Sequence, residues 1–395
     1  MKIAVCIKQV PVVSRITFDY ESKTIVREGV PLEVNSFDML AVDKAVELGK
    51  ETGAEVVVFT MAPPQARDAL VQCLAMGANR AVHLTDRAMA GSDTLATARC
   101  LALALEREDF ALIFCGRNST DAETGQVGPE IAELLHIPYV GNVRRLDYSD
   151  DAGNIVAERV TDQGHEVIRS PLPALVSVTE GIMEERFPSR QDMEAARANP
   201  AIEEVSAPQL SSDSSVFGAT GSPTSVAEIR LIEPRRLGVV IEEPDPQMAA
   251  RKLMDGLAQR PEKVDSKDAA LTGWNRYPGQ VENGVWVVAE RVGPSLRRAT
   301  FELLGKAREL TGHTRSEVGA ILVGSGDEKD VKALAAYGAD KVLLMNDPSL
   351  GHPTSIASTS TLAQAIASKN PYAVLFPSTA NGRDLASRVA ARLSL

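Results

Sequence analysis

The chain has 395 residues, of which 44% are hydrophobic and 24% are charged. This composition is typical of a globular protein, and the length suits two or three domains of about 150 residues each. Acidic residues outnumber basic ones by 53 to 42, for a net charge of -11, which is the wrong sign for a surface that follows nucleic-acid phosphates. No stretch approaches the roughly 18 consecutive apolar residues of a membrane span. We therefore expect no nucleic-acid partner and no membrane insertion.

The four cysteines lie far apart, form no Cys-x-x-Cys pair and stand in apolar surroundings. The N-terminal segment lacks the long apolar stretch and the small-residue cleavage site of a signal peptide. These features predict a cytoplasmic protein with reduced core thiols, and a redox role for the thiols is the less favoured alternative. The residues concerned are Cys6, Cys73, Cys100 and Cys115.

Roughly the first 190 residues alternate short apolar runs, rich in β-branched residues, with helical patterns. Because the runs are apolar almost throughout, they predict strands of a mostly parallel sheet that helices cover on both faces. The predicted strands are residues 2–7, 55–60, 81–84, 111–115 and 174–179.

Two segments between these strands have apolar residues at helical spacing. Residues 37–50 predict a helix that Ser36 caps at its N-terminus and that stops before Gly53. Residues 66–76 predict a second helix, which ends at Gly77.

The composition changes after residue 200. Residues 211–225 are rich in Ser and Gly and predict a flexible connection that buries no core. Residues 236–242 favour a strand, and Asp245, followed by a proline, predicts the start of an amphipathic helix. One strand and one helix make no domain alone, so we interpret this segment as a docking arm. The apolar face of its helix consists of Met248, Ala249, Leu253, Met254 and Leu257.

A polar stretch at residues 261–283 precedes a strand at residues 285–288, and from there the chain repeats features of its first part. Residue types and spacing agree at three places, which predicts two copies of one α/β unit packed as a pseudo-dimer, with chance resemblance as the alternative. The second copy lacks most of residues 16–34, where the first copy predicts a hairpin. The matching segments are residues 7–10 and 289–292, 73–86 and 334–347, and 110–114 and 372–376.

Open α/β sheets bind ligands at the carboxyl ends of their strands, and residues 116–126 form the best candidate loop. This loop carries several hydroxyl and amide groups and leads into a helix predicted to start near Pro129. Backbone N–H groups at the helix start, together with the hydroxyls of Ser119 and Thr124, would hold a phosphate. The loop is neither a Walker A loop nor a Gly-x-Gly-x-x-Gly fingerprint, so a polar loop without a ligand is the alternative. The second copy lacks the counterpart of residues 124–126.

The sequence contains no pattern for hydrolytic or metal chemistry. The five histidines show no His-x-x-x-His spacing, and zinc sites need such clusters. A Gly-x-Ser-x-Gly nucleophile elbow is also absent. We therefore predict neither catalytic residues nor a metal site.

Four segments within residues 1–200 share the pattern of one protein family, namely residues 1–11, 35–38, 74–78 and 115–129. In these segments the chain resembles the beta subunit of electron transfer flavoprotein. Residues 239–253 resemble the C-terminal arm of that subunit. Residues 285–395 resemble the N-terminal domain of the alpha subunit, notably at residues 338–342 and 381–386. The two subunits are related in that domain, which would account for the internal repeat.

The resemblance implies a fold and a domain organisation. The expected fold consists of two related three-layer α/β domains with mostly parallel sheets, similar to the adenine nucleotide alpha hydrolases, with an extended connecting arm. The FAD domain of the alpha subunit would follow Leu395, so we expect a truncated piece of a beta–alpha fusion. The expected divisions are a beta-like nucleotide-binding domain at residues 1–200, a linker with the docking arm at residues 201–262, a second linker at residues 263–284 and an incomplete alpha-like domain at residues 285–395.

The resemblance also implies cofactors. In this family the beta subunit binds AMP, or a second FAD in bifurcating members, and the C-terminal domain of the alpha subunit holds the electron-carrying FAD. We therefore expect AMP or FAD in the first domain, and alpha-site FAD only together with the missing domain. Phe37 matches an aromatic residue near the ring of the alpha-bound FAD. The nucleotide site carried over from the family comprises Cys6, Asn35, Ser36, Phe37, Asp38, Met61, Gly116, Arg117, Asn118, Ser119, Thr120, Asp121, Ala122, Glu123, Thr124, Gly125 and Gln126.

The implied function is that of an electron carrier without catalytic residues of its own, which passes electrons from flavin dehydrogenases to a quinone reductase or a ferredoxin-type acceptor. The family's recognition loop usually carries a leucine where this chain has Arg190, and a charged side chain enters an apolar pocket only at a desolvation cost. This departure weakens the expectation of an acyl-CoA dehydrogenase partner. Two other classes stay open. An ATP-pyrophosphatase-type enzyme would need a Ser-Gly-Gly-rich loop where residues 8–11 stand, and a nucleotide-free scaffold would purify without a ligand.

Overall fold

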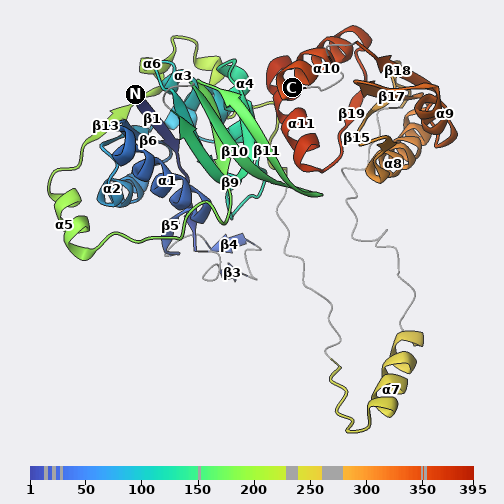
Figure 1. Cartoon of the computed structure of the whole chain (residues 1–395), viewed down its shortest axis with the longest axis horizontal. Helices are drawn as coiled ribbons and strands as arrows, with labels where there is room; N and C mark the ends of the chain where they lie inside the picture. The colour runs from blue at the N-terminus through green and yellow to red at the C-terminus, as the bar shows by residue number, and fades with distance from the viewer. Residues whose placement is uncertain are drawn as a thin grey trace.

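The computed structural model describes residues 1–12, 17–19, 24–26, 30–149, 153–227, 239–259, 279–347, 350 and 354–395. Two open α/β units stand side by side, and one helix lies apart from both (Figure 1). The two sheets are mostly parallel, which confirms the predicted α/β class.

The first unit is built around a nine-stranded sheet with the order β11-β10-β9-β12-β8-β1-β6-β7-β13. Its centre is parallel, and each of the predicted apolar runs forms a strand there. Side chains on both faces of these strands are buried, as runs without polar alternation predict. The central strands are β1 (Lys2–Cys6), β6 (Glu55–Met61), β7 (Arg80–Leu84), β8 (Leu112–Gly116) and β12 (Ala174–Val178).

Four strands of this sheet are not predicted by the sequence analysis. Three of them form an antiparallel extension at one edge, where β9 pairs with β10 and β10 with β11. Most residues of β11 are exposed, so the extension has no continuous apolar run to mark it. At the other edge, the short strand β13 pairs in parallel with β7. The bounds are Tyr139–Ser149 for β9, Asn154–Thr161 for β10, Gly164–Pro171 for β11 and Ile202–Val205 for β13.

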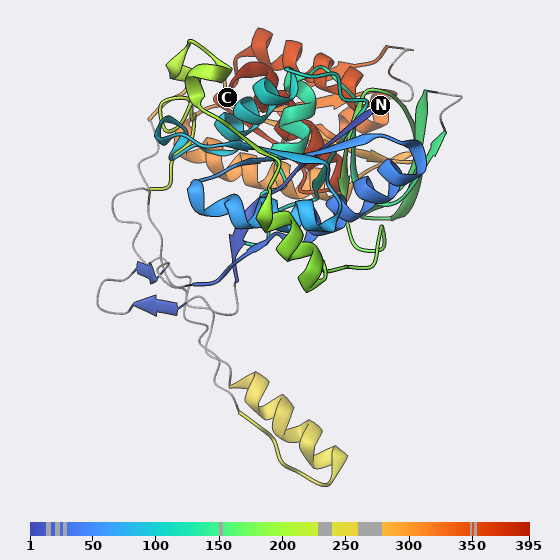
Figure 2. The same cartoon turned by 90° about the vertical axis from the view of Figure 1, so that its left-hand side faces the viewer.

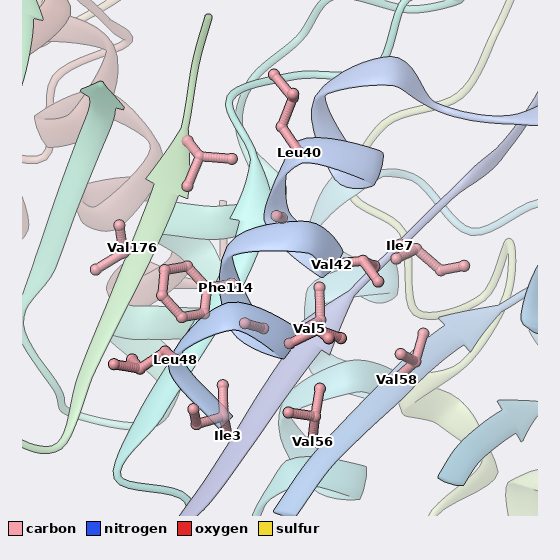
Figure 3. Close-up of a cluster of buried hydrophobic side chains, with 14 of the residues drawn as sticks. Ile3, Val5, Ile7, Leu40, Val42, Leu48, Val56, Val58, Phe114 and Val176 are labelled. Carbon is pink, nitrogen blue, oxygen red and sulfur yellow. The ribbon is translucent and has the colours of Figure 1, made fainter. Parts of the chain in front are cut away.

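Helices cover both faces of the parallel strands. Helices α1 (Ser36–Thr52) and α2 (Arg67–Met76) pack on one face, and α3 (Thr94–Leu105) and α4 (Val127–Leu134) pack on the other. Figure 3 shows Leu40, Val42 and Leu48 of α1 in one cluster with apolar side chains of β1, β6 and β8. Successive residues of β1 point to opposite faces, so one strand contributes to two cores.

The ends of the predicted helices agree with the structure except at one point. Helices α1 and α2 end at Gly53 and Gly77, whose φ angles of 71° and 118° require the left-handed region that glycine adopts freely. The N-cap of α1 is Asn35, so the prediction that Ser36 takes this position was wrong. The side chain of Asn35 does not cap the helix, because it bonds elsewhere, as described below.

A pair of short antiparallel ribbons precedes α1. Strands β3 (Thr17–Asp19) and β4 (Thr24–Val26) pair with each other, which confirms the predicted hairpin. Strands β2 (Gln9–Pro11) and β5 (Leu32–Val34) form the second ribbon. The second unit retains only a counterpart of the latter ribbon, since β15 (Arg291–Val292) pairs with β16 (Ser295–Leu296).

The Ser- and Gly-rich segment after residue 206 packs against the first unit. Helix α5 (Arg190–Ala198) leads to β13, and α6 (Ala207–Leu210) follows. Phe217 is 2% exposed and belongs to the core beneath α3. The hydroxyl of Ser222 accepts a hydrogen bond from the backbone N–H of Asp93 at 2.8 Å. The prediction that residues 211–225 form a flexible connection without core was therefore wrong, because one buried aromatic ring and local hydrogen bonds hold the segment in place.

Helix α7 (Pro246–Ala258) lies away from both sheets in Figures 1 and 2. Asp245 accepts a hydrogen bond from the backbone N–H of Gln247 at 2.9 Å, which confirms the predicted helix start. Four members of the predicted apolar face, Met248, Leu253, Met254 and Leu257, are between 48% and 64% exposed. Residues 239–242 form no strand, and the rest of the strand predicted at residues 236–242 lies outside the described residues, as does most of the linker predicted at residues 263–284.

The second unit has the strand order β18-β17-β14-β19, which repeats the order β7-β6-β1-β8 of the first unit. Four helices follow its strands in the same succession as α1 to α4, and Gly77 and Gly338 end corresponding turns with φ angles of 118° and 109°. The structure thereby confirms the internal repeat. The strands are β14 (Val285–Ala289), β17 (Val318–Val323), β18 (Lys341–Met345) and β19 (Ala373–Leu375), and the helices are α8 (Arg298–Thr314), α9 (Glu328–Ala336), α10 (Ser355–Lys369) and α11 (Ala380–Leu393).

The two units meet through the corresponding helices α4 and α11, as a pseudo-dimer requires. At the centre of this contact, the Nε atom of Arg388 donates to a carboxylate oxygen of Glu133 at 2.9 Å. The side chains of Arg388 and Glu133 are only 1% and 2% exposed. Arg392 donates to the other oxygen of the same carboxylate. A buried ion pair therefore joins the units.

Candidate functional site

The loop that connects β8 to α4, residues 117–126, lies at the carboxyl ends of β1 and β8. These two strands are parallel neighbours. From β1 the chain builds the sheet first toward β6 and β7 and then returns to add β8 on the other side, so the strand order reverses between β1 and β8. Open α/β sheets bind ligands at such switch points. The structure thus places the predicted loop at the edge of the sheet where a ligand is expected.

The carboxylate of Asp38, in the first turn of α1, holds the ends of these two strands together. It accepts hydrogen bonds from the backbone N–H groups of Lys8 and Gly116, each at 2.8 Å. Burial raises the pKa of Asp38 to about 7, although these hydrogen bonds act in the opposite direction. A Cβ atom on Gly116 would lie 2.5 Å from Oδ1 of Asp38 and 2.6 Å from Cβ of Phe37. Only glycine allows α1 to approach the loop this closely.

Asn35 and Lys8 anchor the first half of the loop. Asn35 is 1% exposed, and its amide donates to the carbonyl oxygen of Asn118 at 2.9 Å. The side-chain oxygen of Asn35 accepts from the backbone N–H of Thr120 at 3.1 Å. The ammonium group of Lys8 lies 2.8 Å from both carboxylate oxygens of Asp121. The loop is therefore held in shape by residues that precede α1 and follow β1.

The second half of the loop turns into α4, which begins at Val127, two residues before the predicted start. Glu123 and Gly125 have φ angles of 53° and 63°, in the left-handed region. The N-cap residue Gln126 makes no side-chain capping bond. Pro129 has no N–H group, so Val127 and Gly128 supply the first N–H groups of α4, and the Gln126 side chain does not occupy them. The helix dipole favours a negative charge at this position.

A cavity of about 430 Å³ lies beside the loop. Arg117, Asn118, Glu123 and Gly125 line it from the loop side, and α11 of the second unit contributes Asp384. The side-chain oxygen of Asn118 is buried and has no hydrogen-bond partner among the described residues. The cavity falls within the roughly 300 to 1,000 Å³ of small-molecule sites. The lining thus combines an unpaired acceptor with both cationic and acidic side chains.

Of the predicted site residues, only Arg117, Asn118, Glu123 and Gly125 line this cavity, and the others lie on neighbouring segments. Cys6, Asn35, Phe37 and Asp38 are buried beneath the loop, where they support it. The guanidinium carbon of Arg117 lies 4.4 Å from the centre of the Phe37 ring. Met61 ends β6, the neighbour of β1. Along the loop and at the start of α1 lie the remaining predicted residues, Ser36, Gly116, Ser119, Thr120, Asp121, Ala122, Thr124 and Gln126.

The sequence analysis misses several residues of this region. Lys8 follows β1 directly, and its place at the strand end is the signal that would have found it. Glu130 lies in α4, is 3% exposed and accepts from the hydroxyl of Thr94 at 3.1 Å. Burial raises the pKa of Glu130 to about 7. No sequence signal leads to Asp384, because only the packing of the two units brings it to the cavity.

The four cysteines are free and buried, and burial raises the pKa of the Cys6 thiol to about 12, so the thiol stays protonated. The described residues contain no cluster of three or more side chains that would hold a metal ion. None of the described helices is both long and apolar enough to cross a bilayer.

Comparison with known proteins agrees with this geometry. The family model for the electron transfer flavoprotein domain matches residues 22–210 and 285–395. The electron transfer flavoprotein subunit beta of Thermoanaerobacterium thermosaccharolyticum is 38% identical over 240 residues, which is 61% of this chain and 92% of the relative. The subunit beta of Clostridium acetobutylicum is 38% identical over 250 residues, or 63% of this chain and 95% of the relative. Protein FixA of Azorhizobium caulinodans is 37% identical over 280 residues, or 69% of this chain and 99% of the relative.

The fold defines a class of protein with a doubly wound α/β unit, and a polar loop lies at its switch point. The chain belongs to the electron transfer flavoprotein family. The relatives named beta subunit match about three fifths of the chain. The same family model matches the second unit as well, in agreement with the repeated strand order.

Proposed function

We propose that the chain combines a beta-type unit with an alpha-type N-terminal unit of an electron transfer flavoprotein. The proposed divisions are residues 1–200, the arm at residues 201–262, a linker at residues 263–284 and residues 285–395. Two observations support this arrangement. The family model matches both units, and the four central strands of the first sheet recur in the same order in the second.

The nucleotide we propose for the first unit is AMP, bound structurally at residues 116–126. The uncapped start of α4 carries this proposal. The N–H groups there, with the hydroxyl of Thr124, would hold the phosphate, and the buried oxygen of Asn118 would accept a hydrogen bond from the amino group of the base. Asp38 and Asn35 would keep the loop in its binding shape through their hydrogen bonds to the strand ends and the loop.

The proposed role is to carry electrons from flavin dehydrogenases to a quinone reductase or a ferredoxin-type acceptor, without catalytic residues in this chain. The proposed partner is an alpha-type domain that holds FAD, and FAD, when bound, supplies the redox chemistry. This chain would contribute the docking arm with α7 and the Phe37–Arg117 pair beside the flavin. We propose the cytoplasm as its location, because all four cysteines are free thiols.

Arg190 bears on the choice of dehydrogenase. Its side chain is 92% exposed and pairs with Glu194 one helical turn further along α5. An exposed cation at this position suits an acidic or polar docking surface better than an apolar pocket. We therefore propose a dehydrogenase partner whose docking surface is acidic or polar.

The test is to denature the purified chain and identify the released nucleotide by chromatography. We expect AMP at about one equivalent. FAD in its place would assign the protein to the bifurcating class, and ATP hydrolysis by the intact protein would support the ATP-pyrophosphatase alternative. If no nucleotide is released, the proposed nucleotide site is contradicted. A nucleotide-free scaffold is then the remaining alternative.

Two glycine variants test the position of the site. Gly125 and Gly53 have similar left-handed φ angles of 63° and 71°, so alanine at either position costs a similar roughly 1 kcal/mol of backbone strain. A Cβ atom on Gly125 would lie 3.1 Å from the carbonyl oxygen of Arg117, whereas none at Gly53 meets an atom within 4 Å. Gly125→Ala should release the nucleotide, and Gly53→Ala should retain it.

A further inference from the structure

A cavity of about 810 Å³ lies between the two units. On the second unit it touches the ends of β14 and β17 and the starts of α10 and α11. On the first unit, β9, β10 and β11 form its opposite wall. It adjoins the cavity beside residues 117–126, because Tyr139, Arg159 and Asp384 line both. The other residues that line the cavity between the units do not line the cavity beside residues 117–126.

This cavity occupies the switch point of the second sheet. Strand β14 has β17 on one side and β19 on the other, and the chain reaches them in opposite directions, so the strand order reverses at β14. The repeated strand order makes β14 and β19 the counterparts of β1 and β8. The second unit therefore has a hollow in the position that corresponds to the candidate nucleotide site of the first unit.

The cavity between the units and the cavity beside residues 117–126 differ in the groups that could bind a ligand. In the second unit only four residues, 376–379, separate β19 from α11, and the hydroxyl of Thr379 is already engaged by the backbone N–H of Gly382 and by Glu290. The second site thus has no phosphate loop. Any ligand there must be held by the side chains that line the cavity.

Asp384 supplies a buried carboxylate to this cavity. The residue is 7% exposed, and one carboxylate oxygen accepts from the hydroxyl of Ser355 at 2.6 Å. The other oxygen, Oδ1, is buried and has no hydrogen-bond partner among the described residues. Burial raises the pKa of Asp384 to about 6, although the positive charges of Arg388 and Arg159 act in the opposite direction. A buried acceptor without a donor is costly, and a ligand N–H group would remove this cost.

The charged side chains of the cavity leave one cation unengaged. Arg159 pairs with Glu166, and Arg291 pairs with Asp330. Arg169, on the exposed edge strand β11, has no ion pair with another described residue. The lining also includes the apolar side chains of Val288, Ile356 and Leu362. The cavity thus offers an acceptor, an apolar wall and a free guanidinium.

We propose that this cavity is a second ligand site, which binds a nucleoside monophosphate with an amino-substituted base. The amino group donates to Oδ1 of Asp384, the base lies against the apolar wall, and Arg169 binds the phosphate in the bidentate manner typical of arginine. This site is separate from the one proposed at residues 116–126, and a chain with both holds two nucleotides.

The experiment is calorimetric titration of the nucleotide-free full chain with AMP at pH 7. We expect two equivalents. Ile356 is 41% exposed, so Ile356→Trp fills the cavity without disturbing a core and should reduce the count to one. Arg169→Ala should weaken one of the two sites at least tenfold, whereas the control Arg145→Ala, on the exposed side of β9 away from both cavities, should change neither site.

The variant Gly125→Ala separates this inference from the proposed function. It should remove the site at residues 116–126 and leave the inter-unit site intact. One equivalent in the wild type that Gly125→Ala removes and Ile356→Trp preserves would overturn the second site alone. One equivalent with the opposite response would overturn the loop site alone, and no binding of AMP would overturn both. Circular dichroism of each variant shows whether it is folded.

Discussion

The ion pair that joins the two units leads to a sharp prediction for Glu133→Gln. In the wild type, the carboxylate of Glu133 receives hydrogen bonds from Arg388 at 2.9 Å and from Arg392 at 2.5 Å. Glu133 and Arg388 are almost fully buried, whereas the side chain of Arg392 is 30% exposed. One nitrogen of Arg388, Nη1, is buried without a partner among the described residues. Removal of the carboxylate charge would leave the buried Arg388 cation with only the weaker electrostatic attraction of Asp384.

The size of the effect follows from this burial. Loss of one partner from a buried ion pair typically lowers the free energy of unfolding by about 3–5 kcal/mol, whereas replacement of both partners by apolar residues is often close to neutral. We therefore expect about 3–5 kcal/mol for Glu133→Gln and a much smaller change for the double variant Glu133→Leu with Arg388→Met. Arg392 tolerates the loss because its side chain reaches solvent.

Urea denaturation at pH 7, followed by circular dichroism, measures these values. Because α4 and α11 form the contact between the units, Glu133→Gln should also split the unfolding into two transitions, one for each unit. The control is Arg190→Ala, which removes an exposed pair and should change the free energy of unfolding by less than about 0.5 kcal/mol. The reasoning would be refuted if Glu133→Gln lowered the free energy of unfolding by less than about 1 kcal/mol. It would also be refuted if the effect of the double variant equalled the sum of the effects of its two single substitutions.

Three further predictions concern buried groups. Burial raises the pKa of Glu130 from 4.5 to about 7, so the folded protein keeps a proton that the unfolded chain releases, and stability falls as the pH rises between these values. Glu130→Gln should equal the wild type near pH 4.5 and exceed it by about 3 kcal/mol at pH 8 in urea titrations. Gly116→Ala should cost about 1–3 kcal/mol through the clash with Asp38, whereas Gly305→Ala, with no atom within 4 Å of the new methyl group, should not destabilise. Phe217→Ala should cost about 3 kcal/mol in thermal unfolding, and Val226→Ala, at an 80% exposed position, should have no measurable effect.

The parallel strands and their helices were predictable because their physical cause is local. A strand buried on both faces must be apolar throughout, so β1, β6 and β8 are marked in the sequence by uninterrupted apolar runs. The helices α1 and α2 are bounded by glycines that adopt the left-handed conformation. The repeat was visible for a related reason, since two copies of one fold need the same residue types at the same turns.

The antiparallel extension and the packed segment after residue 206 were not predictable in this way. Most of β11 is exposed, so its sequence resembles that of a polar loop. Phe217 is a single aromatic residue in a Ser- and Gly-rich stretch, and its burial depends on the hollow that α3 and β13 provide. Neither feature has a periodic signal.

The residues of the candidate site also divide into those that the sequence identified and those that only the structure revealed. The sequence by itself determined the loop at residues 116–126, because a polar segment with glycines directly after a buried strand marks the carboxyl edge of a sheet. Only the tertiary structure decided which residues face a ligand and which support the loop. Asp38 and Asn35 turn their side chains to backbone groups of distant segments, and Asp384 reaches both cavities from a helix more than 250 positions further along the chain. Such contacts depend on how distant segments and the two units pack against each other. No local sequence pattern encodes this packing.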